Sequence, residues 1–295
     1  MTISKNPKPK RMKIKLVLTL SAMLLLNVVM AQQKAESTPL VQSQIQVAPI
    51  KDTQNNRQYE LYIELPEGYA ENPDKKYPVL YYTDAVWHME VLSAGAEYIL
   101  TEAILVGISW QKDPNPDLLE KHGPQVSRYW DYSITESDNP EVQEKYQLGQ
   151  AHNHLGFIRQ DVIPYVEQNY RTDPENRSYF GYSMSGLFGA YVLLSQPDTF
   201  RNYILGSPSL KGDVEELRRL SSKIPVSGIN AHAFISYGED EKEASTHIDP
   251  FIDLLKARKD PELSVTHQVL EGNHQTAFPL TGIHSVKWLA NLVQQ

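Results

Sequence analysis

Cysteine is absent from all 295 residues of the chain. This absence excludes disulfide bonds, a thiol nucleophile and cysteine metal ligands, so the fold must depend on an ordinary hydrophobic core. Basic residues are scarce as well, since 28 lysines and arginines stand against 36 aspartates and glutamates, for a net charge of −8. An acidic protein repels nucleic acid and anionic membrane surfaces, and we therefore expect neither as a partner.

Long apolar runs are missing too, except for one near the N-terminus. Residues 16–30 are almost wholly apolar and follow a leader with six basic and no acidic residues. This run is shorter than the roughly 20 residues that a membrane-spanning helix needs. The pattern predicts a secretory signal peptide over residues 1–31, cleaved after Ala31, with an uncleaved membrane anchor as the alternative. We therefore expect a periplasmic or secreted mature protein, of net charge −14, with no stable membrane insertion.

The remaining chain divides into a polar lead-in at residues 32–43 and a single domain at residues 44–295. Alternating apolar and polar residues predict an antiparallel hairpin of strands 44–49 and 59–65. Strands and helices alternate after this hairpin, which predicts an α/β fold: a mostly parallel sheet with helices on both faces. The expected strands are 77–83, 103–110, 177–182, 203–206, 233–237 and 265–270, and the expected helices are 87–100, 149–170, 187–194, 214–223, 248–257 and 283–293.

Ser183 has the surroundings of a nucleophile elbow. It lies in the run Gly181-Tyr182-Ser183-Met184-Ser185, between the strand 177–182 and the apolar helix 187–194. A serine on such a sharp turn is lifted clear of the sheet, and its neighbours must be small because strand and helix nearly touch. Ser185 replaces the last glycine of G-x-S-x-G and is still small. The alternative interpretation is a structural turn serine.

A serine nucleophile needs a histidine base and an acid that orients the histidine. His274 is the histidine, among nine, that occupies a turn directly after a strand with a glycine nearby. Three adjacent carboxylates follow the strand 233–237. We favour Glu241 among them for its reach, with Asp240 as the alternative. Both candidate partners come just past the carboxyl end of a strand, where ligands gather in open α/β sheets.

No metal or other cofactor is expected. His152 and His154 form an H-x-H pair, but no third ligand has a plausible spacing. The chemistry of a serine, a histidine and an acid does not require a cofactor.

Two further groups of residues are predicted around Ser183. The N–H of Met184 and an N–H from the loop 84–86 are the expected donors for an oxyanion. Residues 111–147 lack clear periodicity, and a loop of this length is usually functional. Trp130 and Tyr132 in this segment are predicted to line a substrate pocket. The equally good alternative is that they anchor the long loop to the rest of the protein by hydrophobic contacts. Asp84 and Tyr182 are the other predicted substrate-binding residues.

Several of these segments resemble the esterase family of α/β-hydrolases that includes trilactone siderophore esterases, feruloyl esterases and mycolyltransferases. The resemblance covers nearly all of residues 45–295 in the order of the family. The matching segments are residues 77–84, 106–110, 128–132, 157–194, 207–209, 238–241 and 271–274.

The resemblance implies an α/β-hydrolase fold and a serine hydrolase that cleaves small-molecule carboxylic esters through an acyl-enzyme. It implies Ser183 as nucleophile, His274 as base, Glu241 as acid (a position where some members lack one) and Val86 as the second oxyanion donor. Siderophore esterases often continue their Ser-Pro-Ser segment with tryptophans, but here the segment continues with residues 210–212, Leu-Lys-Gly. The substrate therefore stays open between siderophore and aryl esters. The alternatives are an acyltransferase of the same fold and a non-catalytic periplasmic ligand-binding protein.

Overall fold

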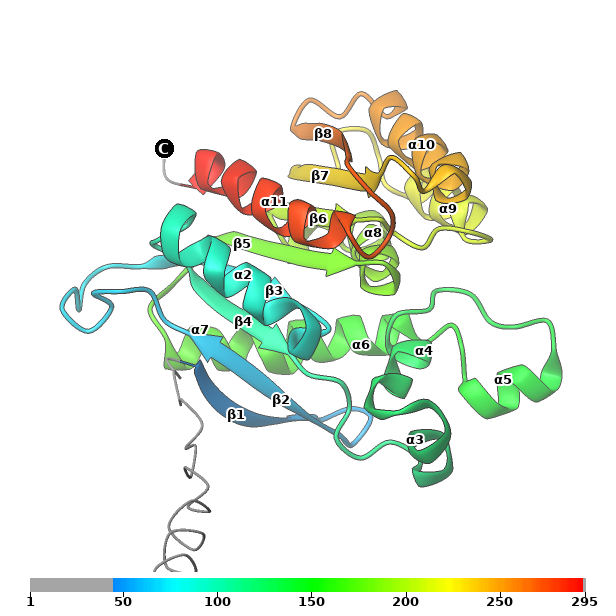
Figure 1. The fold of residues 1–295 in the computed structure, drawn as a ribbon, viewed down its shortest axis with the longest axis horizontal. Coiled ribbons are helices and arrows are strands. Elements are labelled where there is room, and N and C mark those ends of the chain that lie inside the picture. The colour runs from blue at the N-terminus through cyan, green and yellow to red at the C-terminus, as the bar shows by residue number, and fades with distance from the viewer. Residues whose placement is uncertain (1–44, 294–295) are drawn as a thin grey trace, which may run out of the picture. The chain divides into compact units, whose positions relative to one another are not determined.

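The structure, a computed structural model, describes residues 45–293 (Figure 1). The predicted signal peptide and polar lead-in lie outside this range. Within it, no helix combines the length and the apolar character that crossing a membrane requires.

Eight strands form one sheet in the order β1-β2-β4-β3-β5-β6-β7-β8 (Figure 1). The first pair is the predicted antiparallel hairpin, in which Ile50 lies opposite Tyr59. Strand β2 is also antiparallel to β4, and every later pair is parallel. The predicted fold class is therefore confirmed. The strands are β1 (Ile45–Asp52), β2 (Arg57–Glu64), β3 (Tyr77–Tyr82), β4 (Ile104–Ile108), β5 (Thr172–Tyr182), β6 (Asn202–Gly206), β7 (Ala231–Gly238) and β8 (Leu263–Leu270).

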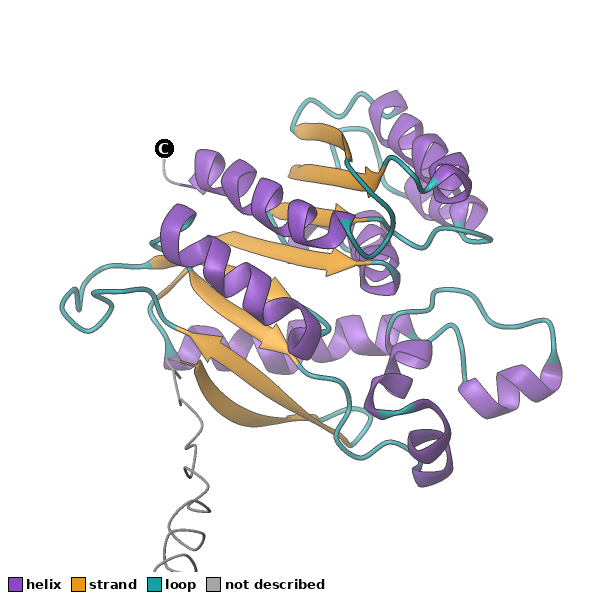
Figure 2. Ribbon diagram, viewed as in Figure 1, coloured by secondary structure: helices purple, strands orange, loops and turns teal. Residues whose placement is uncertain are grey.

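Both faces of the sheet are apolar and covered by helices (Figure 2). In β5, Tyr179 points into one core and Phe180 into the other, and neither is accessible to solvent. Such continuous burial is typical of parallel strands between two helical layers. Helices α2 (Ala85–Ile99) and α11 (Ala277–Val293) cover one face. The other face is covered by α6 (Ala151–Phe157), α7 (Ile163–Asn169), α8 (Met184–Ser195), α9 (Val214–Lys223) and α10 (Lys242–Ala257). A short 3-10 turn, η3 (Pro197–Thr199), follows α8.

The predicted helix 149–170 contains a π-helical turn, η2 (Ile158–Val162), between α6 and α7. The N–H of Ile163 there bonds to the carbonyl of Ile158, five residues back. Pro164 follows directly and has no N–H to donate. A proline inside a helix usually kinks it, and here one wide turn accommodates Pro164.

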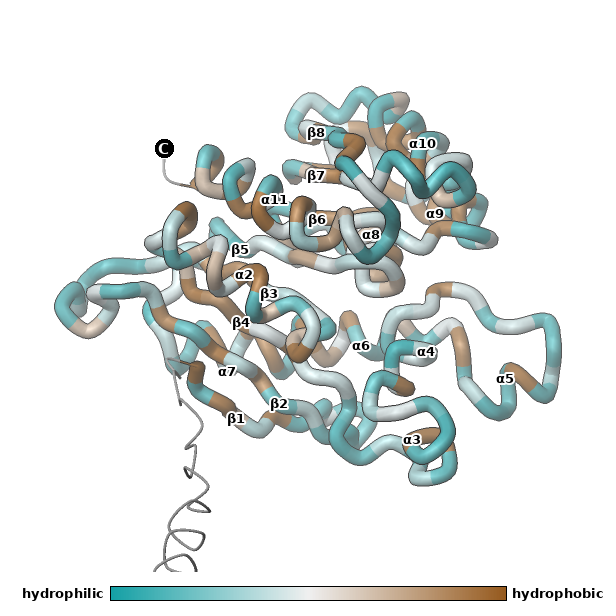
Figure 3. Tube along the Cα trace, viewed as in Figure 1, coloured by the Kyte–Doolittle hydropathy of each residue, from teal (hydrophilic) through white to brown (hydrophobic). Residues whose placement is uncertain are grey.

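Residues 111–147 are not the irregular loop that their sequence predicts. They form α3 (Pro116–His122), the 3-10 helix η1 (Pro124–Ser127), α4 (Arg128–Asp131) and α5 (Pro140–Tyr146). Asn115 caps α3 by accepting hydrogen bonds from two N–H groups of its first turn, and Asn139 caps α5 in the same way. Each asparagine precedes a proline at the first helical position, which is a favoured helix start. Figure 3 shows this segment to be largely hydrophilic, so its sequence has no repeating apolar positions that would predict a helix.

The carboxyl ends of the parallel strands meet at one edge of the sheet (Figure 1). The turn from β5 into α8 and the loops after β6, β7 and β8 all lie at this edge. The N-terminus of α2 and the helices α3 to α5 lie there as well. The fold thus brings together segments that are far apart in the sequence, as the general rule for open α/β sheets predicts.

Candidate active site

Ser183 joins β5 to α8 in a strained backbone conformation. Its φ of 62° and ψ of −119° are unusual for a residue with a side chain and cost on the order of 1–3 kcal/mol. Hydrogen bonds hold the turn: the Ser183 N–H donates to the Gly206 carbonyl at 2.9 Å, and the N–H groups of Leu187 and Ser209 donate to the Ser183 carbonyl at 3.0 Å. The side chain is half-buried. The turn thus has the geometry of a nucleophile elbow.

Small residues around Ser183 allow this turn. A Cβ on Gly181 would lie 2.2 Å from the carbonyl oxygen of Ser185, which no side chain can tolerate. Ser185 itself is buried, and its hydroxyl accepts from the Tyr182 N–H and donates to the Tyr182 carbonyl, both at 2.9 Å. Serine in place of the usual glycine therefore closes the turn with its own hydrogen bonds.

Glu241 Oε2 and His274 Nδ1 lie 2.7 Å apart, at hydrogen-bond distance. The other carboxylate oxygen, Oε1, accepts from the Ser207 hydroxyl at 2.6 Å and the Gly238 N–H at 2.8 Å. Burial raises the pKa of the Glu241 carboxyl, but the hydrogen bonds that it accepts outweigh burial and hold the pKa below its ordinary value. Asp240, the alternative acid, is exposed. The geometry therefore favours Glu241 as the orienting acid.

His274 and Ser183 lie on neighbouring turns but are not hydrogen-bonded to each other in the described residues. The Ser183 Oγ lies 3.2 Å from the hydroxyl of Ser209. Tyr182 links the two turns, because its hydroxyl donates to the His274 carbonyl at 2.7 Å and its ring centroid lies 5.1 Å from the imidazole. Catalytic hydrogen bonds are often loose before substrate binds. The catalytic roles of Ser183, His274 and Glu241 stay predictions.

The predicted oxyanion donors stand at the N-termini of two helices. Met184 begins α8, and Val86 lies in the first turn of α2. The first N–H groups of a helix have no carbonyl partner one turn back, and this end of the helix attracts negative charge. In α2, the Asp84 carbonyl accepts from Trp87 and His88 at 2.9 and 3.2 Å. The Val86 N–H has no partner of this kind within the helix and suits the predicted role.

Asp84 is fully buried and binds other residues of the chain. Its carboxylate accepts from Trp110 Nε1 at 2.6 Å and from Arg128 Nε and Nη2 at 2.9 and 3.0 Å. A substrate contact, as the sequence predicts, would require this carboxylate to lose partners. In the structure this carboxylate fixes α4, where Arg128 lies, to the start of α2.

Trp87 is an exposed aromatic residue that the sequence-based reasoning missed. It is 48% exposed, directly follows Val86, and meets the Trp110 ring edge-on at 4.7 Å between centroids. The Arg128 guanidinium lies 5.0 Å from its ring centroid. Trp87 therefore offers a firmly held aromatic surface beside the predicted oxyanion site. Aromatic residues at the start of a helix carry no signal of exposure in the sequence.

The other predicted substrate-binding residues are largely buried. Tyr132 is 1% exposed and packs against His154 and Phe188, so it belongs to the core rather than to an open pocket. Tyr182 is buried and supports His274. Trp130 borders a cleft of about 410 Å³ on residues 111–147, which includes neither Ser183 nor His274. The cleft is lined by Arg57, Gln111, Asn115, Asp117, Leu118, Trp130, Glu144, Lys145 and Gln147.

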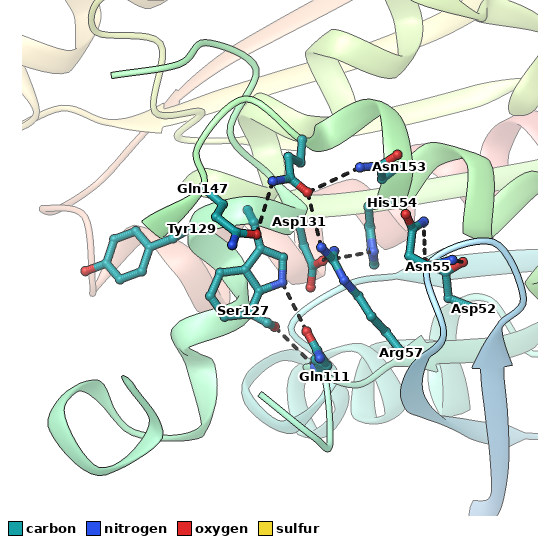
Figure 4. A network of polar contacts seen from close by, with 12 residues as sticks. Asp52, Asn55, Arg57, Gln111, Ser127, Tyr129, Asp131, Gln147, Asn153 and His154 are labelled. Atoms are coloured by element: carbon teal, nitrogen blue, oxygen red, sulfur yellow. Dashed lines mark hydrogen bonds and ion pairs between the residues drawn. The ribbon is translucent and has the colours of Figure 1, made fainter. Parts of the chain in front are cut away.

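A second polar cluster surrounds Asp131 (Figure 4). Asp131 is buried, accepts from the Tyr59 hydroxyl at 2.9 Å and lies 3.5 Å from Arg57. Burial raises the pKa of Asp131 to about 7, although Arg57 opposes this shift. His154 lies 3.7 Å from Asp131, and burial lowers its pKa to about 3, so its ring is neutral. Across residues 45–293, no three His, Cys, Asp or Glu side chains are grouped to hold a metal ion.

Known proteins with similar sequences are esterases. Ferri-bacillibactin esterase BesA of Bacillus subtilis is 29% identical over 176 residues, which cover 56% of this chain and 58% of the relative. Apo-salmochelin esterase of Escherichia coli is 28% identical over 190 residues, which cover 62% of this chain and 57% of the relative. The chain thus spans less than two thirds of the length of either protein.

Solved structures show the same fold. The crystal structure of BES protein from Bacillus cereus has a TM-score of 0.73 at 20% identity, covering 86% of this chain and 99% of that one. In sequence, the family described as "Putative esterase" matches residues 53–294, well over half of the chain. The chain therefore belongs to this esterase family.

Proposed function

We propose that the protein is a serine hydrolase that cleaves carboxylic esters through an acyl-enzyme. The observation that carries this proposal is the Glu241–His274 pair, 2.7 Å apart, on the loops beside the strained turn of Ser183. A carboxylate on Nδ1 leaves Nε2 of the imidazole free to act as a base. This arrangement, together with two helix N-termini at the same edge, has the parts that acyl transfer requires.

The proposed reaction has two halves. The Ser183 Oγ turns from Ser209 toward His274, transfers its proton to Nε2 and attacks the ester carbonyl carbon. The N–H groups of Met184 and Val86 stabilise the resulting oxyanion, and Glu241 stabilises the imidazolium. Collapse of the tetrahedral intermediate breaks the bond to the alkoxy oxygen, which leaves as the alcohol with the proton from His274. Water then repeats these steps on the acyl-enzyme and releases the carboxylic acid.

The proposed substrates are esters of siderophores or related aryl esters. The two relatives described above are named for ferri-bacillibactin and apo-salmochelin, and the chain aligns with 58% and 57% of their lengths. The exposed ring of Trp87 beside Val86 supports an acyl group that carries a flat ring. We also propose that the protein acts in the periplasm or outside the cell, on the basis of the signal-peptide pattern in residues 1–31.

Labelling with a fluorophosphonate probe tests the proposal, because the probe reacts with an activated serine. The wild-type protein should be labelled at Ser183 and should hydrolyse at least one of a panel of short aryl esters, feruloyl esters and macrocyclic trilactones. Ser183→Ala should abolish both. The matched control is Ser222→Ala, which removes an exposed serine hydroxyl on α9 that bonds only to its own helix. An unlabelled wild-type protein with no activity on the panel would instead indicate a non-catalytic ligand-binding protein.

A further inference from the structure

The turn Ser207-Pro208-Ser209 follows β6 and lies next to both the predicted acid and the predicted nucleophile. Ser207 is 2% exposed, and its φ of 36° is a left-handed value that serine rarely adopts. Its N–H donates to the Ser236 carbonyl. A buried residue held in a strained conformation beside a site points to a function for its side chain.

The Ser207 hydroxyl closes a circuit of polar contacts around the acid and the histidine. It donates its one proton to Glu241 Oε1 at 2.6 Å, because a carboxylate only accepts. The Ser207 Oγ also lies 3.0 Å from the Tyr182 hydroxyl, whose own proton goes to the His274 carbonyl at 2.7 Å. The contact between Glu241 Oε2 and His274 Nδ1 completes the circuit. Ser207 therefore fixes the carboxylate end of the catalytic pair directly, and Tyr182 fixes the histidine end.

We infer that Ser207 is a positioning residue: its hydroxyl holds the Glu241 carboxylate against His274 Nδ1. Tyr182 holds the backbone of His274 through the hydrogen bond to its carbonyl. This inference rests on the proposed function and adds residues to its site. Without the Ser207 hydroxyl, Oε1 keeps only the Gly238 N–H, and the carboxylate is held less firmly against rotation away from His274. Hydrogen bonds to charged groups are strong enough that this loss should lower kcat/KM about 10-fold to 100-fold.

Two substitutions distinguish the effect of the Ser207 hydroxyl from the effect of its strained backbone. Ser207→Ala removes the hydroxyl and keeps the strain, whereas Ser207→Gly removes the hydroxyl and relieves the strain, since glycine adopts positive φ freely. Similar losses of kcat/KM in both variants assign the effect to the hydroxyl. The matched control is Ser236→Ala, which removes a buried serine hydroxyl on β7 that contacts Thr281 at 2.9 Å, outside the circuit. It should retain wild-type kcat/KM.

The decisive experiment combines Ser207→Gly with Glu241→Gln. If Ser207 acts through Glu241, the double variant should be no slower than Glu241→Gln alone, whereas a general structural role would make the two losses multiply. The low-field NMR resonance of the His274 Nδ1 proton gives a second readout, because the hydrogen bond to Glu241 protects this proton from exchange. It should be sharp in the wild-type protein and in Ser236→Ala, and broadened in Ser207→Gly.

Wild-type kcat/KM in Ser207→Gly, multiplied losses in the double variant, or an unchanged Nδ1 resonance would each overturn the inference. Its failure can be told from failure of the proposed function. A wild-type protein that neither hydrolyses esters nor labels at Ser183 contradicts the proposed function, and the Nδ1 resonance then decides the role of Ser207 by itself.

Discussion

Replacing Arg128 by methionine should destabilise the protein strongly, although Arg128 lies on a short, mostly hydrophilic segment. Its guanidinium donates two of the three hydrogen bonds that the Asp84 side chain accepts, and that side chain has no exposed surface. Methionine keeps much of the unbranched stem but neither donor. The variant therefore leaves a buried carboxylate whose remaining partner is the Trp110 indole.

The size of the effect follows from this geometry. Removing one partner of a buried ion pair costs about 3–5 kcal/mol, because the other charge stays buried without compensation. For a domain of this size, such a loss lowers the melting temperature by about 10 °C. Arg219→Met is the matched control, since Arg219 pairs with Glu216 on α9 and is 54% exposed. Exposed pairs contribute at most about 1 kcal/mol.

Urea unfolding at neutral pH measures these free energies, with ester hydrolysis followed on the same samples. Adding Asp84→Asn to Arg128→Met should recover at least half of the lost stability, because the buried charge is then gone and asparagine tolerates the left-handed φ of 54° at this position. Activity should fall in Arg128→Met mainly through kcat, since Val86 lies two residues after Asp84. A free energy of unfolding for Arg128→Met within about 1 kcal/mol of the wild-type value would refute the reasoning.

Two more predictions concern stability. Gly181→Ala should prevent correct folding of the Ser183 turn, because its Cβ would lie 2.2 Å from the Ser185 carbonyl oxygen. The control Gly156→Ala should fold normally, because the nearest atom to its Cβ is a side-chain oxygen of Gln54 at 3.3 Å. Equal soluble yield and equal melting temperature of the two variants would contradict this prediction. Burial raises the pKa of Asp131 from 3.8 to about 7, so the folded state binds more protons than the unfolded state in this range. The contribution of Asp131 to stability should therefore fall as pH rises from about 4 to 7, against the opposite contribution of His154, whose pKa burial lowers. In urea unfolding at several pH values, the stability of Asp131→Asn relative to the wild type should therefore rise from pH 4 to 7, and parallel curves would show that Asp131 does not titrate there.

The sheet and most helices were predictable because their signals are local. The apolar runs of β3 to β7 and the helices between them follow from periodicity and from the alternation of elements. The elbow at Ser183 was predictable because its turn needs small residues at fixed positions. His274 and Glu241 follow strands, and the carboxyl ends of parallel strands share one edge, so their approach to each other follows from topology.

The short helices of residues 111–147 were not predictable from periodicity, since none of them spans more than two turns. Their start signals were present at Asn115-Pro116 and Asn139-Pro140, but a cap without an apolar stripe predicts little by itself. The bond between Asp84 and Arg128 joins residues 44 positions apart, and no pattern in either segment indicates it. The positive φ of Ser207 likewise has no local signal in the sequence, because the fold imposes it.

The burial of the residues predicted to bind substrate itself suggests where the substrate lies. At the start of α2 the charged Asp84 is wholly buried, whereas the indole of Trp87, three residues later, is 48% exposed. Hydrophobicity alone predicts the opposite arrangement, since charged residues are rarely buried without a partner and large apolar side chains favour the core. Arg128 makes this inversion possible, because it pairs with Asp84 and also lies 5.0 Å from the Trp87 ring centroid. A protein gains no stability from exposing an aromatic ring, and local conflicts of this kind concentrate at functional sites. Trp87, rather than the buried Tyr132, is therefore the aromatic residue that we expect to contact the substrate.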